Sequence, residues 1–181
     1  MNKNYSTLAL GIALAMSVTS ANAEMPIDSA SAGIAIQSVS DIDSGMALVL
    51  NAKKKQPNIH ENLSFEGEFT YTLSSPSTSQ TILGTDFTTE LTVMSLAGYG
   101  VFTHPISSQL NVYGRVGLLY ESVSAEACAG STCVSADNSE TGLSYGAGVQ
   151  FNISDTMAVR ADYTIIEADV SHIGVGVKMG F

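Results

Sequence analysis

The sequence predicts an all-β protein, an eight-stranded antiparallel up-and-down transmembrane β-barrel. Three observations favour this fold class. Apolar and polar side chains alternate along much of the chain with the two-residue period of a β-strand. Most charged side chains within the strands share the parity opposite to the apolar side chains. The connections between strands are short at one end and include long ones at the other, as expected for a membrane barrel.

The first 23 residues have the features of a secretory signal peptide. Lys3 gives a weakly positive start, residues 8–18 are apolar, and Ala21-Asn22-Ala23 fits the small-residue cleavage pattern. Cleavage after Ala23 would leave residues 24–181, which we expect to form one barrel domain. No later run reaches the length of a transmembrane helix, but membrane strands need only about ten residues and alternate in polarity.

Eight segments of the mature chain have strand patterning, because β-branched, aromatic and glycine residues dominate them and helical periodicity is weak. In chain order they are residues 31–39, 46–53, 60–73, 90–102, 109–122, 141–153, 157–167 and 170–181. Two of them, 46–53 and 90–102, carry apolar residues on both parities. The sequence therefore leaves open which of their faces would point into the barrel.

The segment 109–122 shows the alternation most clearly. Val112 and Val116 lie on one face, and Asn111, Arg115 and Glu121 lie on the other. The same inward parity is expected for the charged residues of four strands, which are Glu66, Glu68, Arg115, Arg160, Asp162 and Lys178.

We expect these six charges to form a salt-bridge network that fills the lumen, because eight strands leave an interior just wide enough for side chains. One alternative is a narrow, porin-like ion channel. A further alternative is a soluble exported β-barrel that binds a hydrophobic ligand, in which the charged face would meet solvent.

The two longest connections, residues 74–89 and 124–140, fall at the same end of the predicted barrel. They are rich in Ser, Thr, Ala and acidic residues, and we expect them to be extracellular loops that could bind a ligand. The opposite end has short turns rich in Pro, Asn, Asp and Ser. The Lys53-Lys54-Lys55 run is expected to be a solvated turn there.

Cys128 and Cys133 lie in the second long connection. In an oxidising compartment a close pair within a Gly/Ser-rich loop is typical of a disulfide, which would hold the loop in shape. Zinc would need two further ligands, and no His or Cys is nearby in the sequence. The sequence suggests no cofactor.

The net charge of −10 argues against nucleic-acid binding, which needs clustered Lys and Arg. A catalytic role is also disfavoured. Ser171 and His172 are adjacent on a strand and so point to opposite faces, whereas a nucleophile and its base must come within about 3 Å. We therefore expect no enzyme, although a lipid A-modifying barrel is the enzymatic alternative.

The chain ends on a strict alternation whose apolar positions are Ile173, Val175, Val177, Met179 and Phe181. Such a strand would pair with the first strand and close the barrel, because an open edge in lipid leaves backbone groups without partners. The candidate aromatic residues for the two membrane interfaces are Tyr71, Tyr99, Phe102, Tyr120, Phe151 and Phe181.

The stretches "VYGRVGLLYES", "GLSYGAGVQFNISDTMAVRADYT" and "HIGVGVKMGF" resemble the OmpA-like, opacity-type family of small outer-membrane barrels. The resemblance implies a Gram-negative outer-membrane location, contact with outer-membrane lipid and lipopolysaccharide, and a structural or adhesin-like role. It also implies that the terminal alternation is a signal for the barrel-assembly machinery, although Met179 stands where an aromatic residue is common. The separate peptidoglycan-binding domain of full-length outer-membrane protein A has no counterpart in this chain.

Overall fold

The computed structural model describes residues 27–39, 42–82, 85–129, 132–167 and 170–181. Its nine strands are β1 Ser29–Val39, β2 Ile42–Lys55, β3 Leu63–Ser74, β4 Ser77–Ile82, β5 Thr85–Pro105, β6 Leu110–Ala129, β7 Thr132–Asn152, β8 Met157–Glu167 and β9 Val170–Gly180. Within this described part of the chain, no helix is long and apolar enough to cross a membrane. The signal peptide expected at residues 1–23 lies outside the described residues.

The strands form one antiparallel sheet that closes into a barrel. Chain neighbours pair from β1 to β3 and from β4 to β9, β9 pairs with β1, and β3 pairs with β5. The short β4 continues along β5 beyond the end of β3, so β3 and β4 share one position in the barrel wall. Pro76 lies at the break and has no N–H to donate to a sheet. The predicted eight-stranded antiparallel barrel is confirmed.

The apolar faces of the strands point outward and the charged faces point inward. Val116 on β6 and Val175 on β9 are 60% and 54% exposed, whereas Glu66 on β3 and Arg160 on β8 are 3% and 6% exposed. A soluble barrel with a dry core would show the reverse. The apolar exterior is therefore the surface that lipid would cover.

The structure also settles the facing of the two ambiguous strands. On β2, Ala47 and Val49 point inward, and on β5, Val93, Ala97 and Val101 point inward. Together with aromatic and aliphatic residues of other strands, some of these side chains form a small apolar cluster inside the barrel: Ala97, Tyr99, Val101, Tyr113, Leu119 and Ile166. The lumen is thus not uniformly polar, which is why the apolar pattern of these two strands had no single parity.

Tyr99 corrects one of the expectations for the membrane interface. Its side chain is 2% exposed and lies inside the barrel, so it cannot contact the lipid interface. The other five candidate interface aromatics are all on the exposed exterior. These are Tyr71, Phe102, Tyr120, Phe151 and Phe181.

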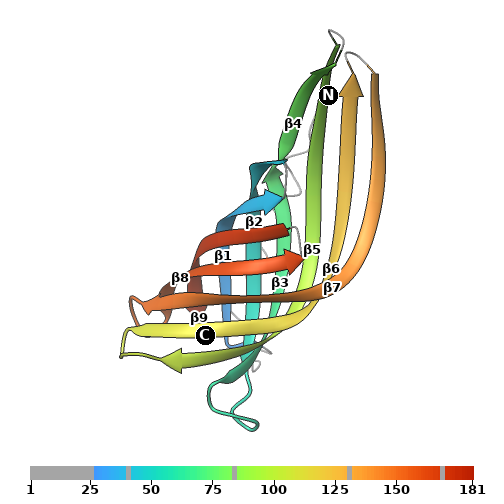
Figure 1. Cartoon of the computed structure of the whole chain (residues 1–181). Coiled ribbons are helices and arrows are strands. Elements are labelled where there is room, and N and C mark those ends of the chain that lie inside the picture. The colour runs from blue at the N-terminus through green and yellow to red at the C-terminus, as the bar shows by residue number, and fades with distance from the viewer. Residues whose placement is uncertain (1–26, 40–41, 83–84, 130–131, 168–169) are drawn as a thin grey trace.

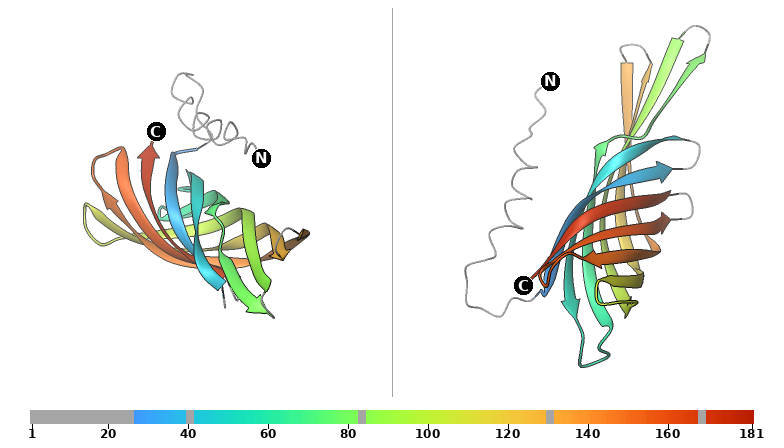
Figure 2. Two further views of the ribbon diagram at one scale, coloured as in Figure 1. Left: turned by 90° about the horizontal axis from the view of Figure 1, so that it is seen from above. Right: turned by 90° about the vertical axis from the view of Figure 1, so that its left-hand side faces the viewer.

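Four strand segments continue well beyond the rest of the barrel (Figure 1). We call them the projecting sheet: β4 with residues 85–93 of β5, 123–129 of β6 and 132–138 of β7. Figure 2 shows the β4–β5 and β6–β7 hairpins rising together above the strands on the other side of the barrel. The expectation that residues 74–89 and 124–140 are loops is therefore wrong, because most of them lie in strands.

The physical reason is that pairing with neighbouring strands, rather than burial of an apolar face, sets the strand conformation of these segments. Thr and Val are frequent in them, and their neighbours continue the register of the barrel, so backbone pairing extends outward without a break. A weak alternation of small apolar residues with Ser, Thr and acidic residues is hard to distinguish from a loop in the sequence.

At the opposite end the turns are short, comprising residues 56–62, 106–109 and 153–156. The chain terminus also lies at this end, where the Phe181 N–H donates to the Asp28 carbonyl at 3.0 Å. Residues 53–55 belong to β2 rather than to a turn, which corrects the expectation for the three lysines. Alternation along the strand consequently separates Lys54 from its two neighbours.

Candidate functional site

The centre of the lumen holds a network of five charged side chains from three strands. Glu66 and Glu68 come from β3, Arg115 from β6, and Arg160 and Asp162 from β8. Each occupies an inward position of its strand, and β3 and β8 face each other across the barrel rather than pairing. We call these five residues the lumen network.

Arg115 is the centre of this network. Its Nη1 donates to Glu66 Oε1 at 3.1 Å and to Glu68 Oε2 at 2.5 Å, and its Nη2 donates to Asp162 Oδ1 at 3.1 Å and to the Thr164 hydroxyl. The guanidinium also lies 4.5 Å from the centre of the Tyr99 ring. Its side chain has no exposed surface, so Arg115 joins β3 to β8 through the middle of the lumen.

Arg160 makes a second crossing on the side of the short turns. Its Nη1 and Nη2 donate to the two oxygens of Glu66 at 3.0 and 3.2 Å, which is the paired geometry that favours Arg over Lys. Its Nε donates to Asp162 Oδ2 at 3.2 Å and to the Tyr113 hydroxyl at 3.1 Å. With three carboxylates and two guanidinium groups, the lumen network carries a formal charge of −1.

Glycine makes room for one of the aromatic side chains beside this network. Tyr113 on β6 is paired with Gly148 on β7, and a Cβ atom at Gly148 would lie 2.5 Å from the Tyr113 phenol ring and its hydroxyl. The ring therefore occupies the space of the missing side chain. From there its hydroxyl donates to Asp162 Oδ2 at 3.1 Å.

The sixth predicted member, Lys178 on β9, does not join the network. Its Nζ donates to Gln150 Oε1 at 3.1 Å, nearer the end with the short turns. Lys53 on β2 lies at the same level, where its Nζ donates to Thr103 Oγ1 at 3.4 Å. The lumen position of Lys53 was not predicted, because its strand had no clear facing in the sequence. The available signal was that Lys53 and Lys55, two residues apart, share one face of a strand.

On the other side of the lumen network, His172 on β9 is 1% exposed. Among the described residues, neither of its ring nitrogens has a hydrogen-bond partner. No described serine hydroxyl is therefore positioned for activation by this imidazole, and Ser171 is on the opposite parity of the strand. His172 therefore forms no nucleophile–base pair with any described residue.

Asp28 lies just outside the strands, at the end with the short turns. Its carboxylate accepts the Lys55 backbone N–H at 2.5 Å and the Lys54 ammonium at 3.2 Å. The backbone hydrogen bond, aided by the two lysine charges, holds the pKa of Asp28 below its ordinary value of 3.8. These contacts tie the start of β1 to the end of β2.

The projecting sheet ends in the predicted disulfide. Cys128 on β6 and Cys133 on β7 are register partners with an S–S distance of 2.02 Å, so the bond joins the two strands beside their connection. Lower in the same hairpin, Ser124 Oγ donates to Asp137 Oδ1 at 2.6 Å. The Glu126 carboxylate is near the two sulfurs, but both thiols are used in the disulfide and the chain has no other cysteine.

The two faces of the projecting sheet differ in chemistry. The face continuous with the barrel exterior carries Glu90, Glu126 and Asp137, and Glu90 and Glu126 are directly opposed in the register. The face continuous with the barrel interior carries apolar side chains of all three long strands. These are Leu91, Val123, Ala125, Ala127, Val134 and Ala136.

Much of that apolar face is open to solvent. Val134 is 67% exposed, and residues 132–141 of β7 are exposed on both faces. No described strand pairs with the outer edge of residues 132–144, since β8 meets β7 only from Tyr145 onward. The projecting sheet thus offers two chemically distinct faces and a strand edge outside the barrel.

The chain resembles several solved membrane barrels. The attachment invasion locus protein Ail of Yersinia pestis has a TM-score of 0.58 at 20% identity, covering 87% of this chain and 100% of that one. Neisserial surface protein A gives 0.57 at 16% identity, covering 84% and 95%, and the N-terminal β-barrel domain of Pseudomonas aeruginosa OprF gives 0.55 at 11%, covering 86% and 98%. Ail has also been solved in complex with the heparin analogue sucrose octasulfate, at 22% identity to this chain.

A search of the curated proteins finds no match. The family model for the outer membrane protein beta-barrel domain, however, matches residues 6–181, which is nearly the whole chain. The closed barrel, its apolar exterior and its ionic interior agree with that match. The chain belongs to the outer membrane protein beta-barrel domain family.

Proposed function

We propose that this protein binds an extracellular protein partner through the projecting sheet, with the barrel as its membrane anchor. The observation that carries the proposal is the exposed apolar face of that sheet. An apolar surface held in water beyond the membrane is typical of an interaction site. The lumen network fills the centre of the barrel, so a protein partner could not bind there. The projecting sheet, in contrast, is accessible from outside the barrel.

The charges on the projecting sheet indicate the chemistry of the partner. After Lys55 the sequence contains only three Lys or Arg residues, Arg115, Arg160 and Lys178, and all three side chains lie in the lumen. Glu90 and Glu126 are directly opposed, an arrangement that destabilises a sheet unless positive charge lies nearby. The partner would therefore present apolar side chains flanked by basic ones.

This charge pattern separates the protein from one of its structural relatives. The heparin analogue bound to Ail is a sulfated anion. The described part of the projecting sheet offers carboxylates and hydroxyl groups to solvent, which would repel such a ligand or leave it without a charged partner. We therefore propose a basic protein rather than a sulfated saccharide.

The proposal is tested by adherence of Gram-negative cells that display the protein to cultured epithelial cells. One variant replaces residues 125–136 with Asn-Gly, which shortens β6 and β7 equally and suits a two-residue hairpin turn. A second variant, Val134→Arg, alters only the apolar face. Both should lose adherence while keeping heat-modifiable mobility on gels, which reports an intact barrel.

A matched control is Val134→Ile, which keeps the face apolar and should adhere normally. Unchanged adherence of the shortened variant would contradict the recognition role and leave the structural one. Retention of the wild-type protein on immobilised heparin, abolished by the same shortening, would show that the charge assignment is wrong.

Three further proposals concern how the protein reaches and occupies the membrane. Residues 1–23 would be removed on export, so the mature protein should begin at Glu24 in intact-mass measurements. The barrel exterior would contact outer-membrane lipid and lipopolysaccharide. The alternating residues from Ile173 to Phe181 would be read by the barrel-assembly machinery, and deleting Phe181 should lower the amount of heat-modifiable protein in the outer membrane.

A further inference from the structure

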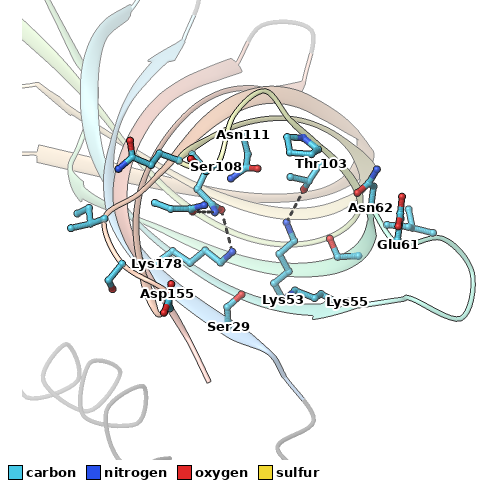
Figure 3. Close-up of a pocket in the computed structure, with 18 residues that line it drawn as sticks. Ser29, Lys53, Lys55, Glu61, Asn62, Thr103, Ser108, Asn111, Asp155 and Lys178 are labelled. Carbon is cyan, nitrogen blue, oxygen red and sulfur yellow. Dashed lines mark hydrogen bonds between the residues drawn. The ribbon is translucent and has the colours of Figure 1, made fainter.

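The lumen opens into a cavity at the end with the short turns, which faces the periplasm in outer-membrane barrels. Its volume is ≈ 610 Å³, within the range typical of small-molecule sites. Three lysines line it: Lys53, Lys55 and Lys178. Figure 3 shows Lys53 and Lys178 extending into the cavity from β2 and β9, the two neighbours of β1, each with one hydrogen bond. We call this the periplasmic cavity.

Within the described residues, the two inner lysines have no direct carboxylate partner, although the Lys53 ammonium lies 5.8 Å from the centre of the Tyr113 ring. In the described part of the chain, Lys53 donates to the Thr103 hydroxyl and Lys178 to the Gln150 amide oxygen. The three carboxylates of the lumen network are each engaged by one or both arginines. An ammonium has three donors, so each lysine retains donors for a ligand.

The lumen network lies further into the barrel than these two lysines, and none of its five residues lines the cavity. Glu66, the register partner of Lys53, accepts hydrogen bonds from both Arg115 and Arg160. It is therefore poorly available as a partner for Lys53. Two half-buried cations lie between the network and the solvent.

The remaining lining favours an anion of more than one charge. Neutral amide and hydroxyl groups dominate it, and its acidic residues, Glu61 and Asp155, are exposed at the rim. Compact ammonium groups are common ligands of phosphate oxygens. The cavity would hold about twenty waters at the volume that each takes up in the liquid, so two linked phosphate groups fit easily.

We propose that the periplasmic cavity binds a phosphate-bearing anion between Lys53 and Lys178, with Lys55 at the mouth. The phosphate could come from a small periplasmic molecule or from the headgroup of an anionic phospholipid at the rim. Lys54 provides an internal contrast. It lies on the other face of β2, where it pairs with Asp28 at 3.2 Å.

The first experiment labels lysine amines in the wild-type protein, so that no variant has to fold. Protein in zwitterionic lipid nanodiscs is acetylated with and without pyrophosphate, and each site is quantified by mass spectrometry. Pyrophosphate should protect Lys53 and Lys178 but not Lys54. A parallel sample in nanodiscs with phosphatidylglycerol and no pyrophosphate tests the lipid source.

Selective protection in either arm supports the site and identifies the source of the phosphate. Equal protection of all three lysines, or none in both arms, would overturn the proposal. Calorimetry with pyrophosphate adds affinities. Lys53→Gln should weaken binding about tenfold, as expected for one lost charge-assisted hydrogen bond, and Lys54→Gln should change it less than about twofold.

Discussion

Arg115 contacts three carboxylates, a hydroxyl and an aromatic ring with no side-chain surface exposed. Replacing it with Met would keep much of its volume. Among the described residues, Glu66 and Asp162 would then pair only with Arg160, and Glu68 would lose its arginine partner. Breaking a buried ion pair from one side costs about 3–5 kcal/mol. We expect Arg115→Met to lower the free energy of unfolding by that amount in denaturant titrations of the lipid-reconstituted protein.

The control for this variant is Lys54→Met, which removes a cation from an exposed pair. Its cost should stay below about 1 kcal/mol, because surface ion pairs contribute little. If both variants lowered the free energy of unfolding by a similar amount, burial would not explain the contribution of Arg115 to stability.

Asp28 gives a pH-dependent prediction at the same scale. Its pKa is lowered in the folded protein, chiefly by the Lys55 backbone N–H, so its contribution to stability is present above the unfolded value of 3.8. That contribution disappears as the pH falls through the lower folded pKa, because the protonated carboxyl group carries no charge. In this respect it resembles the side-chain amide of Asn.

The test compares Asp28→Asn with the wild type across pH. The variant should be less stable at pH 7, by at most about 1 kcal/mol since the pair is solvent-screened. The two proteins should converge as the pH falls below 3.8 and through the lower folded pKa. Denaturant midpoints measured at each pH would report this. A difference that widens on acidification contradicts the assigned hydrogen bond.

Among the strands, β9 and β7 allow a residue on the lipid-facing barrel wall to be compared with a residue on the projecting sheet. Val175 on β9 and Val134 on β7 have similar exposure, 54% and 67%, but only Val175 lies on the barrel wall. We expect Val175→Arg to cost about 2–4 kcal/mol, the range for Arg on the lipid face near the midplane. Val134→Arg should be nearly neutral in the same unfolding titration. An equal loss of unfolding free energy in the two variants would contradict the assignment of Val175 to lipid and Val134 to water.

Strand existence and facing were predictable wherever a strand has one apolar face and one polar face. The segments containing Glu66, Arg115 and Arg160 satisfied that condition, so the residues of the lumen network could be named from parity alone. β2 and β5 could not be assigned, because Val49 and Val101 pack inside the lumen. The contacts within the network, and the separation of Lys178 from it, depend on sheet register, which a single sequence does not specify.

The strands of the projecting sheet could not be predicted from the alternation of apolar and polar residues. Its outer face is polar, its inner face is apolar and exposed, and its strands continue those of the barrel without a break in pairing. A sequence rich in Ser and Thr suggests a loop, whereas the register inherited from β5, β6 and β7 imposes a strand.

For the whole molecule, the main prediction concerns ion flow. Arg115 and Arg160 cross the lumen and bind carboxylates from β3 and β8, so the described centre of the barrel is filled by side chains. We expect purified protein in planar lipid bilayers to give no reproducible unitary currents. Regular channels under the same conditions would support the porin-like alternative instead.

The paired and unpaired sides of β7 should differ in how fast their amides exchange with deuterium. Between residues 132 and 144 one side of the strand is bonded to β6, and no described strand covers the other. Every second N–H in this stretch should therefore exchange quickly while its neighbours stay protected. An incoming chain that lengthened the sheet would slow only the fast set, so isotope uptake could distinguish edge pairing from contact with either face.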